Sequence, residues 1–454
     1  MAKKAKKIKT GKGLKLSVVN PSAAGIDVSS SEMQVCVPED RDSDNNRRFG
    51  VFTEDLEFIS DWLKACRIDT VAMESTGVYW IPLFMTLVSH GFDVLLVNAK
   101  AVKNIGEKKT DEVDAEWIML LHSYGLLKAS FQPNNEARRI RNLSRHRNNL
   151  IKTSSREVLH MQKSMELMNI KLGNVISDIL GKSGQGIIQA ILAGERDASK
   201  LAQLADLRCK SSKEEIAKSL NAKWDDDLLF MLKQSYELYL YIQQQIKACD
   251  MEMESVLKKY QKEVGGGQPF KECLRSKKKK NLKNGLSMDI EWYADQLWGV
   301  NLMRIPGISD TTLSSLLGEL GHDFTDKFDS SKQFCRWCNL TPNNKISGGK
   351  LLSSKVPKRK NPVGQILRNA ANSLRTSKSP LGEYFRHQQF RKGYIPAIIA
   401  TANKMAKMIY IMLKNKTEYD EALIKSDSEQ TLKKKLIRTQ KTLEKIKEQL
   451  KETA

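Results

Sequence analysis

The chain has 454 residues, which at roughly 150 residues per domain is room for about two to four domains. Its 75 Lys and Arg outnumber its 53 Asp and Glu, and the net charge of +22 points to a polyanionic partner, nucleic acid or an anionic membrane surface. An apolar content of 40% excludes a wholly disordered chain, and no apolar run is long enough for a membrane-spanning helix. Seven cysteines do not indicate a disulfide scaffold, and the first residues lack the apolar segment of a secretory signal. We therefore expect a cytoplasmic nucleic-acid-binding protein with no membrane partner.

The N-terminal third of the chain predicts an arm followed by an α/β domain. Residues 1–21 are rich in lysine and contain no acid, as in a basic disordered arm. Residues 22–134 alternate short strands with helices. The expected strands are 23–28, 33–37, 48–52, 70–74 and 94–97, and the expected helices are 53–66 and 78–90. A three-strand meander followed by β–α–β units is the order found in ribonuclease-H-like folds.

Residues 135–263 lose the strand pattern, and we expect long helices there. Between 228 and 260 mostly apolar residues recur at alternating spacings of four and three, which is a heptad seam typical of a coiled coil. The seam consists of Leu228, Leu232, Ser235, Tyr239, Ile242, Ile246, Cys249, Met253, Val256 and Tyr260. The pattern leaves open whether the seam pairs with residues 138–170 of the same chain or with a second chain.

The C-terminal part predicts a linker, a second compact domain and a terminal helix. A glycine run and a lysine run make residues 264–300 a basic insertion or linker. Residues 301–420 have mostly helical patterns and form the second domain. Residues 421–454 form a lysine-rich helix, either a coiled coil or an amphipathic tail, whose apolar positions are Leu432, Leu436, Leu443, Ile446 and Leu450. The expected fold class is therefore α/β plus all-α, with a long helical coiled-coil segment between the two domains.

Four carboxylates could together hold metal ions. Asp27 lies on the first strand, and Glu74 ends a later, buried strand. Asp111 and Asp114 share one face at the start of a helix because they are three residues apart. Unpaired carboxylates beside apolar strands are costly, and Mg²⁺ or Mn²⁺ would neutralise several at once and serve phosphodiester chemistry. The simpler interpretation of the last two is that they are favourable charges in the first turn of a helix.

The second domain has a basic stretch with a serine inside it. From Ser330 to Gly382 the chain has many cations and no acid, which favours a surface for a phosphate backbone. Ser347 is followed by two glycines and Lys350, so a phosphate could approach its hydroxyl closely. The simpler interpretation is a flexible turn. The residues expected to contact nucleic acid are Lys345, Lys350, Lys355, Lys358, Arg359, Lys360 and Arg368.

Cys335 and Cys338 have the spacing of half a zinc site, and His322 is the only histidine near them in sequence. A complete site needs two further ligands. The interpretation that we favour is a short helix with one buried face.

Several motifs resemble the IS110 family of insertion-sequence transposases. Three motifs resemble the RuvC-like DEDD domain of that family: Gly25-Ile26-Asp27-Val28-Ser29, Glu74-Ser75-Thr76-Gly77 and Lys109-Thr110-Asp111-Glu112-Val113-Asp114-Ala115. Four further motifs resemble the family's C-terminal transposase domain: Ile305-Pro306-Gly307-Ile308, Phe334 to Leu340 with Thr341-Pro342, Ser347-Gly348-Gly349-Lys350 and Leu367-Arg368-Asn369-Ala370-Ala371. Each motif alone is weak, but their order along residues 22–131 and 301–415 is specific.

The resemblance implies a recombinase that excises and integrates its own insertion sequence. The metal ligands would be Asp27, Glu74, Asp111 and Asp114. The family's essential serine would be Ser347 and would form a covalent phosphoserine–DNA intermediate, with Ser353 and Ser354 close enough to leave the register open.

The resemblance also implies cofactors and partners. Family members are guided by an element-encoded non-coding RNA, the bridge RNA, which pairs with donor and target DNA. The expected cofactors are thus Mg²⁺ (or Mn²⁺) and a guide RNA. The expected partners are double-stranded donor and target DNA, this RNA, and further copies of the chain in a homodimer that assembles into a homotetramer. The expected location is the nucleoid of a prokaryotic cytoplasm.

Two other functions remain open from the sequence. A metal-dependent, structure-specific nuclease such as a junction resolvase would use the same four carboxylates and water, without covalent serine chemistry. A non-catalytic nucleic-acid-binding assembly protein would need only the basic surfaces and the coiled coils.

Overall fold

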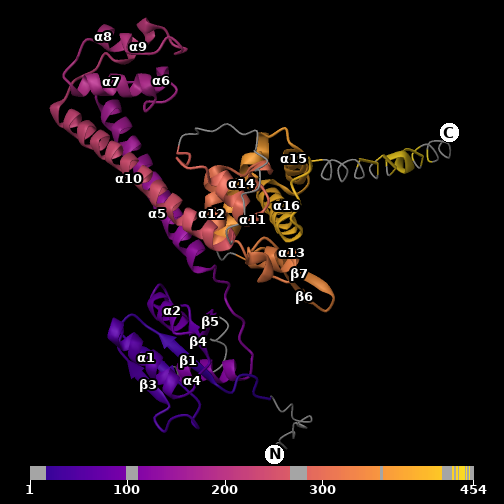
Figure 1. Cartoon of the computed structure of the whole chain (residues 1–454). Helices are drawn as coiled ribbons and strands as arrows, with labels where there is room; N and C mark the ends of the chain where they lie inside the picture. The colour runs from indigo at the N-terminus through magenta and orange to yellow at the C-terminus, as the bar shows by residue number, and fades with distance from the viewer. Residues whose placement is uncertain are drawn as a thin grey trace, which may run out of the picture. The chain divides into compact units, whose positions relative to one another are not determined.

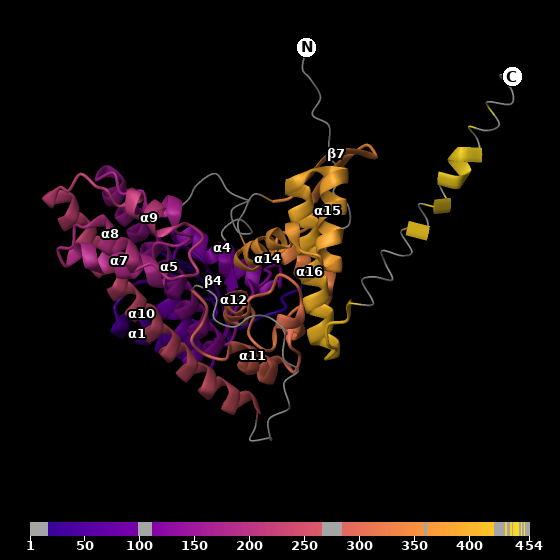
Figure 2. The same ribbon diagram turned by 90° about the horizontal axis from the view of Figure 1, so that it is seen from above.

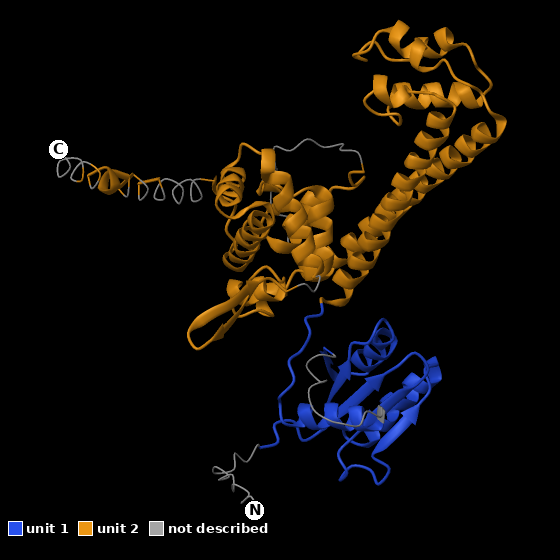
Figure 3. Cartoon of the chain, turned by 180° about the vertical axis from the view of Figure 1, so that it is seen from behind, with its two compact units in different colours: residues 1–132 blue, residues 133–454 orange. Residues whose placement is uncertain are grey.

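The computed structural model describes residues 17–98, 111–265, 284–357 and 361–421, together with parts of a helix between 432 and 449. The chain divides into two compact units, residues 1–132 and residues 133–454 (Figure 3). Each unit is described by itself below. The α/β plus helical fold class predicted from the sequence is confirmed.

The first unit is built on a five-stranded sheet in the order β3-β2-β1-β4-β5 (Figure 1). Its strands are β1 Ala23–Val28, β2 Met33–Cys36, β3 Asn46–Phe49, β4 Thr70–Glu74 and β5 Asp93–Val97. β1, β2 and β3 form an antiparallel meander, whereas β4 is parallel to both β1 and β5. The third strand was expected at 48–52 and begins two residues earlier, because Asn46 pairs with Cys36.

Helices cover both faces of this sheet. Even-numbered residues of β1, such as Ile26, pack with α1 Thr53–Ala65 and α2 Trp80–Ser89 in one apolar core. The odd-numbered residues face the other side, where Gly25 lies against α4 Asp111–Ser123. This alternation follows from the two-residue period of a strand, and it puts Asp27 on the α4 side.

The second unit begins with two long helices that lie side by side (Figure 1). α5 Asn135–Leu167 and α10 Asp226–Gly265 pair within one chain. Most members of the predicted heptad seam are buried between them, including Ile242 and Ile246, which are 4% and 5% exposed. Leu228 and Ser235 are only half-buried, and Tyr236 is buried beside them. Short helices and their apolar core close the far end of this pair; they are α6 Leu172–Val175, α7 Lys182–Leu192, α8 Ala198–Gln203 and α9 Lys213–Ser219.

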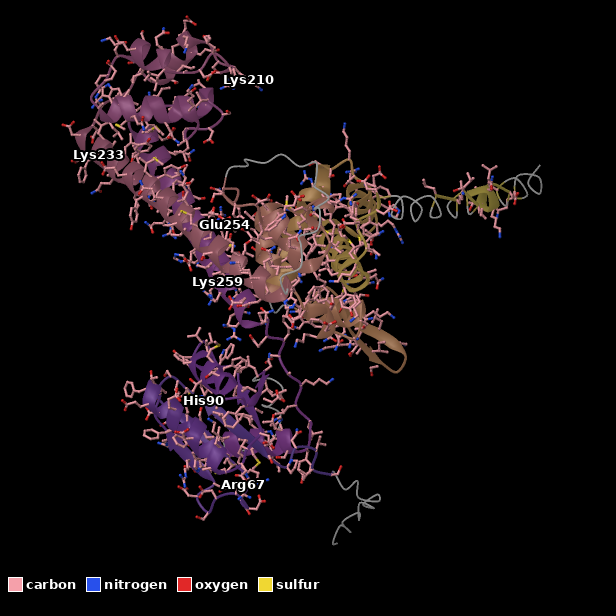
Figure 4. The ribbon with its side chains drawn as sticks, in the orientation of Figure 1. Arg67, His90, Lys210, Lys233, Glu254 and Lys259 are labelled. Carbon is pink, nitrogen blue, oxygen red and sulfur yellow. The ribbon has the colours of Figure 1, made fainter. Side chains whose placement is uncertain are left out.

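A helical body packs at the other end of the long pair. Its elements are α11 Ile290–Trp298, η1 Leu302–Arg304, α12 Asp310–Leu320, η2 Phe324–Asp326, α13 Ser331–Trp337, α14 Pro362–Ser373, η3 Leu374–Thr376, α15 Pro380–Lys392 and α16 Tyr394–Asn415. α15 and α16 run side by side (Figure 2). Glu254 of α10, labelled in Figure 4, accepts a hydrogen bond from Tyr293 of α11, and this bond ties the body to the long pair.

A buried ion pair fixes the junction of the two long helices. Arg147 of α5 and Asp250 of α10 are each 2% exposed, and Nε of the arginine donates to the carboxylate. Arg147 also donates to the carbonyls of Asn284 and Gly285, while Asp250 accepts from the backbone and hydroxyl of Ser287. The pair therefore holds the chain where it enters the body after residues 266–283, which lie outside the described residues.

One antiparallel hairpin interrupts the helices of the second unit. It consists of β6 Asn343–Ser347 and β7 Lys350–Lys355. The sequence analysis expected mostly helices and at most a flexible turn here, so these strands are a correction. These short strands consist mostly of Asn, Lys and Ser, and their three aliphatic residues do not alternate regularly with polar ones, so they lack the pattern by which a half-buried strand is recognised.

The chain termini are described only in part. Residues 1–16 of the predicted arm lie outside the described residues. The described positions between 432 and 449 are helical, and Leu432, Leu436, Leu443 and Ile446 are 52–64% exposed there. Leu450 lies outside them. No helix among the described residues combines the length and apolarity needed to cross a membrane.

Candidate active site

The direction of α4 is fixed at its C-terminal end. The backbone N–H groups of Val19 and Asn20, just before β1, donate to the carbonyl of Ser123. His122 Nε2 lies 2.9 Å from the hydroxyl oxygen of Thr70, at the start of β4. The end of α4 therefore meets the beginnings of β1 and β4, so the helix runs antiparallel to both strands.

Gly25 lets α4 lie directly on β1. A Cβ atom at this position would be 2.2 Å from the backbone nitrogen of Met119 and 2.3 Å from the carbonyl oxygen of Ala115. From this contact, α4 rises by ~1.5 Å per residue toward Asp111, and β1 advances by ~3.3 Å per residue toward Asp27. Asp27 therefore lies roughly 7 Å beyond the contact, and Asp111 lies roughly 6 Å beyond Ala115 and roughly 12 Å beyond Met119, in the same direction along the sheet.

The strand register brings two of the predicted carboxylates together. β1 and β4 pair in parallel, with Gly25 opposite Ala72 and Ile26 opposite Met73. The next step of this register sets Asp27 beside Glu74 on the α4 face. Neighbouring strands are ~4.8 Å apart, so the backbones of these two residues are neighbours at the ends of their strands.

The surroundings of these carboxylates are polar and partly closed. Asp27 is half-buried, and its Oδ1 accepts a hydrogen bond from the backbone of Val28. Glu74 is 6% exposed and accepts a hydrogen bond from the hydroxyl of Thr76 at 3.0 Å. On the other side of Asp27, in register with it, lies Gln34 of β2, which is 4% exposed and donates to Asn46.

Gln34 is a neighbour of the site that the sequence analysis missed. Its signal was an amide at a buried position of a strand that is otherwise apolar. Only the strand register, which pairs Gln34 with Asp27, makes it a neighbour of the site.

The other two predicted carboxylates lie in the first turn of α4. Asp114 is half-buried, whereas its neighbours Glu112 and Glu116 are exposed. Asp111 begins the helix, and its side chain lies outside what the structure describes. Glu107 also lies outside the described residues.

The donors at this edge suit a hard cation. Among the described side chains, no three of His, Cys, Asp or Glu are grouped closely enough to hold a metal ion. Mg²⁺ is commonly bound by one or two carboxylates, with water and substrate phosphate oxygens completing its shell. The neighbouring Asp27 and Glu74 supply such a pair, and the all-oxygen donor set fits Mg²⁺ or Mn²⁺.

Two titratable side chains between the sheet and α4 are buried. Burial, helped by the charges of Glu116 and Glu39, raises the pKa of the Cys36 thiol to about 12. Burial also lowers the pKa of His122, with the charge of Asp93 opposing that shift. A neutral His122 therefore holds the end of α4 against Thr70.

The second predicted site is the turn of the β6–β7 hairpin. Gly348 and Gly349 form the two-residue loop with φ angles of +54° and +76°, as a type I′ turn requires. Ser347 is exposed beside this turn, directly opposite Lys350. The flexible-turn interpretation thus gives way to a defined hairpin with the serine at its tip.

The register separates the three serines. Cross-strand partners share a face, and faces alternate along a strand. Ser353 is opposite Lys345 and so lies on the face of Ser347, whereas Ser354 is opposite Asn344 on the other face.

Hydrogen bonds from two helices clamp the base of the hairpin. Arg368 of α14 donates to the carbonyl of Asn339 at 2.6 Å, and Asn403 of α16 donates to that of Leu340 at 3.1 Å. Gly364 of α14 lies against Cys338, where a Cβ would be 2.0 Å from the carbonyl oxygen. Arg368 therefore supports the chain that leads into the hairpin, and its predicted contact with nucleic acid stays a prediction.

The described cations of the basic stretch, residues 330–382, have no acidic partners among the described residues. Lys345, Lys350 and Lys355 are all exposed. None of the described cations between 330 and 382 forms an ion pair with a described carboxylate. Lys358, Arg359 and Lys360 lie outside the described residues.

The two neighbouring cysteines belong to the apolar core. Cys335 and Cys338 are both fully buried, and burial raises the pKa of the Cys335 thiol to about 11 and that of Cys338 well above its usual value. Among the described residues no third ligand accompanies them. These observations fit a short helix with one buried face better than they fit a zinc site.

Two family models match the chain. The DEDD transposase model of the IS110 family, described as "Transposase", matches residues 24–170, and the model described as "Transposase IS116/IS110/IS902 family" matches residues 300–386. The chain belongs to the IS110 family of transposases. No curated protein sequence matches it. As an IS110-family transposase it is a DNA-processing enzyme with DNA substrates, and its DEDD domain is of a type associated with divalent metals.

Proposed function

We propose that this IS110-family transposase is an RNA-guided recombinase that excises and integrates its own insertion sequence. In this proposal Asp27, Glu74, Asp111 and Asp114 hold Mg²⁺ or Mn²⁺, and Ser347 is the nucleophile. The observation that carries it is the exposed serine at a rigid turn, opposite a lysine, in a chain whose other unit aligns Asp27 with Glu74.

In this proposal the carboxylates hold a divalent metal ion and fix its position. A bound divalent metal would stabilise the charge that develops on the phosphate oxygens during cleavage. Glu74, kept in place by Thr76, and Asp27, flanked by Gln34, form the fixed part of this site. α4 adds Asp114 and Asp111 from above, at a height set by Gly25.

The serine conserves the energy of the phosphodiester bond. Its Oγ forms a bond to the scissile phosphorus, the bond from phosphorus to the leaving nucleoside oxygen breaks, and the serine proton ends on that oxygen. A hydroxyl of the incoming strand then attacks the same phosphorus and releases the serine. Lys350 and Lys345, which share the serine's face, would hold the phosphate during both steps.

The net charge of +22 supports nucleic-acid partners, which include RNA as well as DNA. We propose that an element-encoded bridge RNA pairs with donor and target DNA, so that base pairing selects the sites. We also propose that the chain acts as a homodimer that assembles into a homotetramer, at the nucleoid of a prokaryotic cell. Sequencing of RNA that copurifies with the chain tests the first of these proposals.

Replacing Asp27 by Asn tests the role of the carboxylates. The amide keeps the size of the side chain but loses the charge that attracts a divalent cation. We expect Asp27→Asn to abolish strand exchange and to weaken Mn²⁺ binding, measured by electron paramagnetic resonance on the full chain. RNA binding and thermal unfolding should not change.

The matched control is Asp61→Asn, because Asp61 is an exposed aspartate on α1, away from the α4 face. This variant should behave as wild type in both assays. Normal strand exchange by Asp27→Asn, or by wild type in EDTA, would contradict the metal proposal.

A further inference from the structure

The β6–β7 hairpin has two chemically different faces. The pairs Ser347–Lys350 and Lys345–Ser353 lie on one face together with Lys355, which is opposite Asn343. The pair Ile346–Leu351 lies on the other face. One face is thus basic and carries the serine, and the other is aliphatic next to the tip.

A bulge adds a third exposed aliphatic residue next to the tip. The register shifts between Lys345 and Ile346, which leaves Leu352 without a partner across the hairpin. Bulges re-aim side chains and are common beside functional sites. Ile346, Leu351 and Leu352 are 64%, 58% and 68% exposed, so three aliphatic side chains are in water at one end of a two-stranded ribbon.

Such a surface indicates a partner. A two-stranded hairpin is only marginally stable in water, and an aliphatic cluster at its tip adds to the cost of exposure. Its base is nevertheless held firmly, because Arg368 and Asn403 bind the chain just before β6. A ribbon with a fixed base and an apolar tip is suited to pushing into its partner.

Charge complementarity identifies the partner as nucleic acid. Lys345, Lys350 and Lys355 are exposed, and no acid occurs between Ser330 and Gly382. A protein partner would usually be met by charges of both signs at the rim of the contact, whereas a rim of cations alone favours a phosphate backbone. Many proteins that bend DNA insert aliphatic side chains as wedges that unstack base pairs.

We propose that the β6–β7 hairpin is a wedge that opens the DNA duplex at the cleavage site. Ile346, Leu351 and Leu352 pack against the base pair at the opened end. The opposite face follows the backbone of one separated strand and brings Ser347 to its phosphate. The inference rests on the proposed function and deepens it, since pairing of DNA with a guide RNA requires that the duplex be opened.

The test uses 2-aminopurine, a base whose fluorescence rises when it is unstacked. Duplexes made from the ends of the element carry it at successive positions, and the full chain is added with its copurified RNA. Wild type should raise the fluorescence at one or two steps. Ile346→Thr with Leu351→Thr, which places β-branched residues of high strand propensity at both positions, should abolish that rise and slow cleavage of intact duplex about a hundredfold.

A premelted substrate separates loss of the wedge from loss of the fold. Duplexes with mismatches at the affected step need no opening, so the threonine variant should cleave them at the wild-type rate. The matched control, Lys345→Gln with Lys350→Gln, should lower the slope of log affinity against log salt by about 0.7 to 0.9 for each phosphate that is no longer neutralised. At saturating protein this lysine variant should give the same fluorescence rise as wild type.

Three results would overturn the wedge. They are a normal fluorescence rise in the threonine variant, a failure of mismatches to rescue its cleavage, and a changed mass in solution with normal opening, which would make the aliphatic face a protein contact. The wedge and the proposed chemistry can fail separately. Ser347→Ala should still open the duplex, because opening precedes cleavage, and a serine that forms no DNA adduct would leave this result unchanged.

Discussion

Gly25 shows how one missing side chain positions a site. It allows α4 to touch β1 through the backbone at Ala115 and Met119, and this contact sets the height of the first turn of the helix. In the proposed metal site, the carboxylates of α4 depend on this contact, because no side chain at Gly25 separates the helix from the sheet.

Gly25→Ala should therefore damage both stability and activity. The added methyl group would lie 2.2 Å from a backbone atom of α4, so the helix has to move. Overpacking of this kind costs ~1–3 kcal/mol, and we expect a fall of that size in the free energy of unfolding, measured by urea denaturation. Mn²⁺ binding and strand exchange should fall with it.

Gly186→Ala serves as the comparison, because a Cβ at Gly186 meets no atom within 4 Å. It should leave activity intact. An unchanged free energy of unfolding in Gly25→Ala would contradict the close contact.

At this scale the sequence analysis found residues that bear charges and missed those that position them. Asp27 and Glu74 were named because acids at the ends of apolar strands are unusual, and the register makes them neighbours. Gln34, Gly25 and the clamp by Arg368 depend on which strand or helix lies opposite. A single sequence does not contain that information.

The two long helices are joined by a charged contact as well as by the apolar seam. Arg147 and Asp250 lie where the long pair meets the segment at 284–287, and each satisfies several groups of that segment. A buried pair of this kind fixes the register of two helices, because any slip leaves charges unpaired.

A double-mutant cycle measures this coupling. Arg147→Met alone and Asp250→Leu alone should each lower the free energy of unfolding by about 3–5 kcal/mol, since each leaves a buried charge without its partner. The double variant should lose less than the sum of the two. Strict additivity in urea denaturation would contradict the coupling. The control is the exposed pair of Lys233, labelled in Figure 4, and Glu237 on α10, where additivity is expected.

Elements with a strong periodic pattern were predicted well, and those without one were not. The strands of the sheet and the α10 seam follow directly from their apolar spacing. The β6–β7 hairpin consists of exposed, mostly polar residues, and only its two glycines indicated a turn. The sequence also did not show that the seam pairs within one chain, because a heptad pattern does not specify its partner.

At the scale of the whole molecule, the long pair should be required for activity. Ile242→Asp with Ile246→Asp puts two charges into the buried seam, and burying an unpaired charge is strongly unfavourable. We expect α5 and α10 to separate, the newly exposed apolar residues to associate between chains and so change the mass in solution, and strand exchange to stop.

Gln244→Asp with Ala248→Asp adds the same charges to exposed positions of α10 and should leave mass and activity unchanged. Light scattering and a strand-exchange assay give both readouts. A seam variant with the wild-type mass and activity would contradict this role.

The most direct test of the account is to identify the atom that becomes joined to DNA. A nicked duplex from the end of the element traps the cleavage intermediate, nuclease removes all but a short nucleotide, and mass spectrometry locates the modified residue. We predict a phosphodiester on Ser347 and no adduct with Ser347→Ala. A modified Ser353 would move the nucleophile along the same face of the hairpin, and a modified Ser354 would contradict the face assignment. Cleaved DNA with free ends and no adduct would contradict serine chemistry and favour a hydrolytic nuclease.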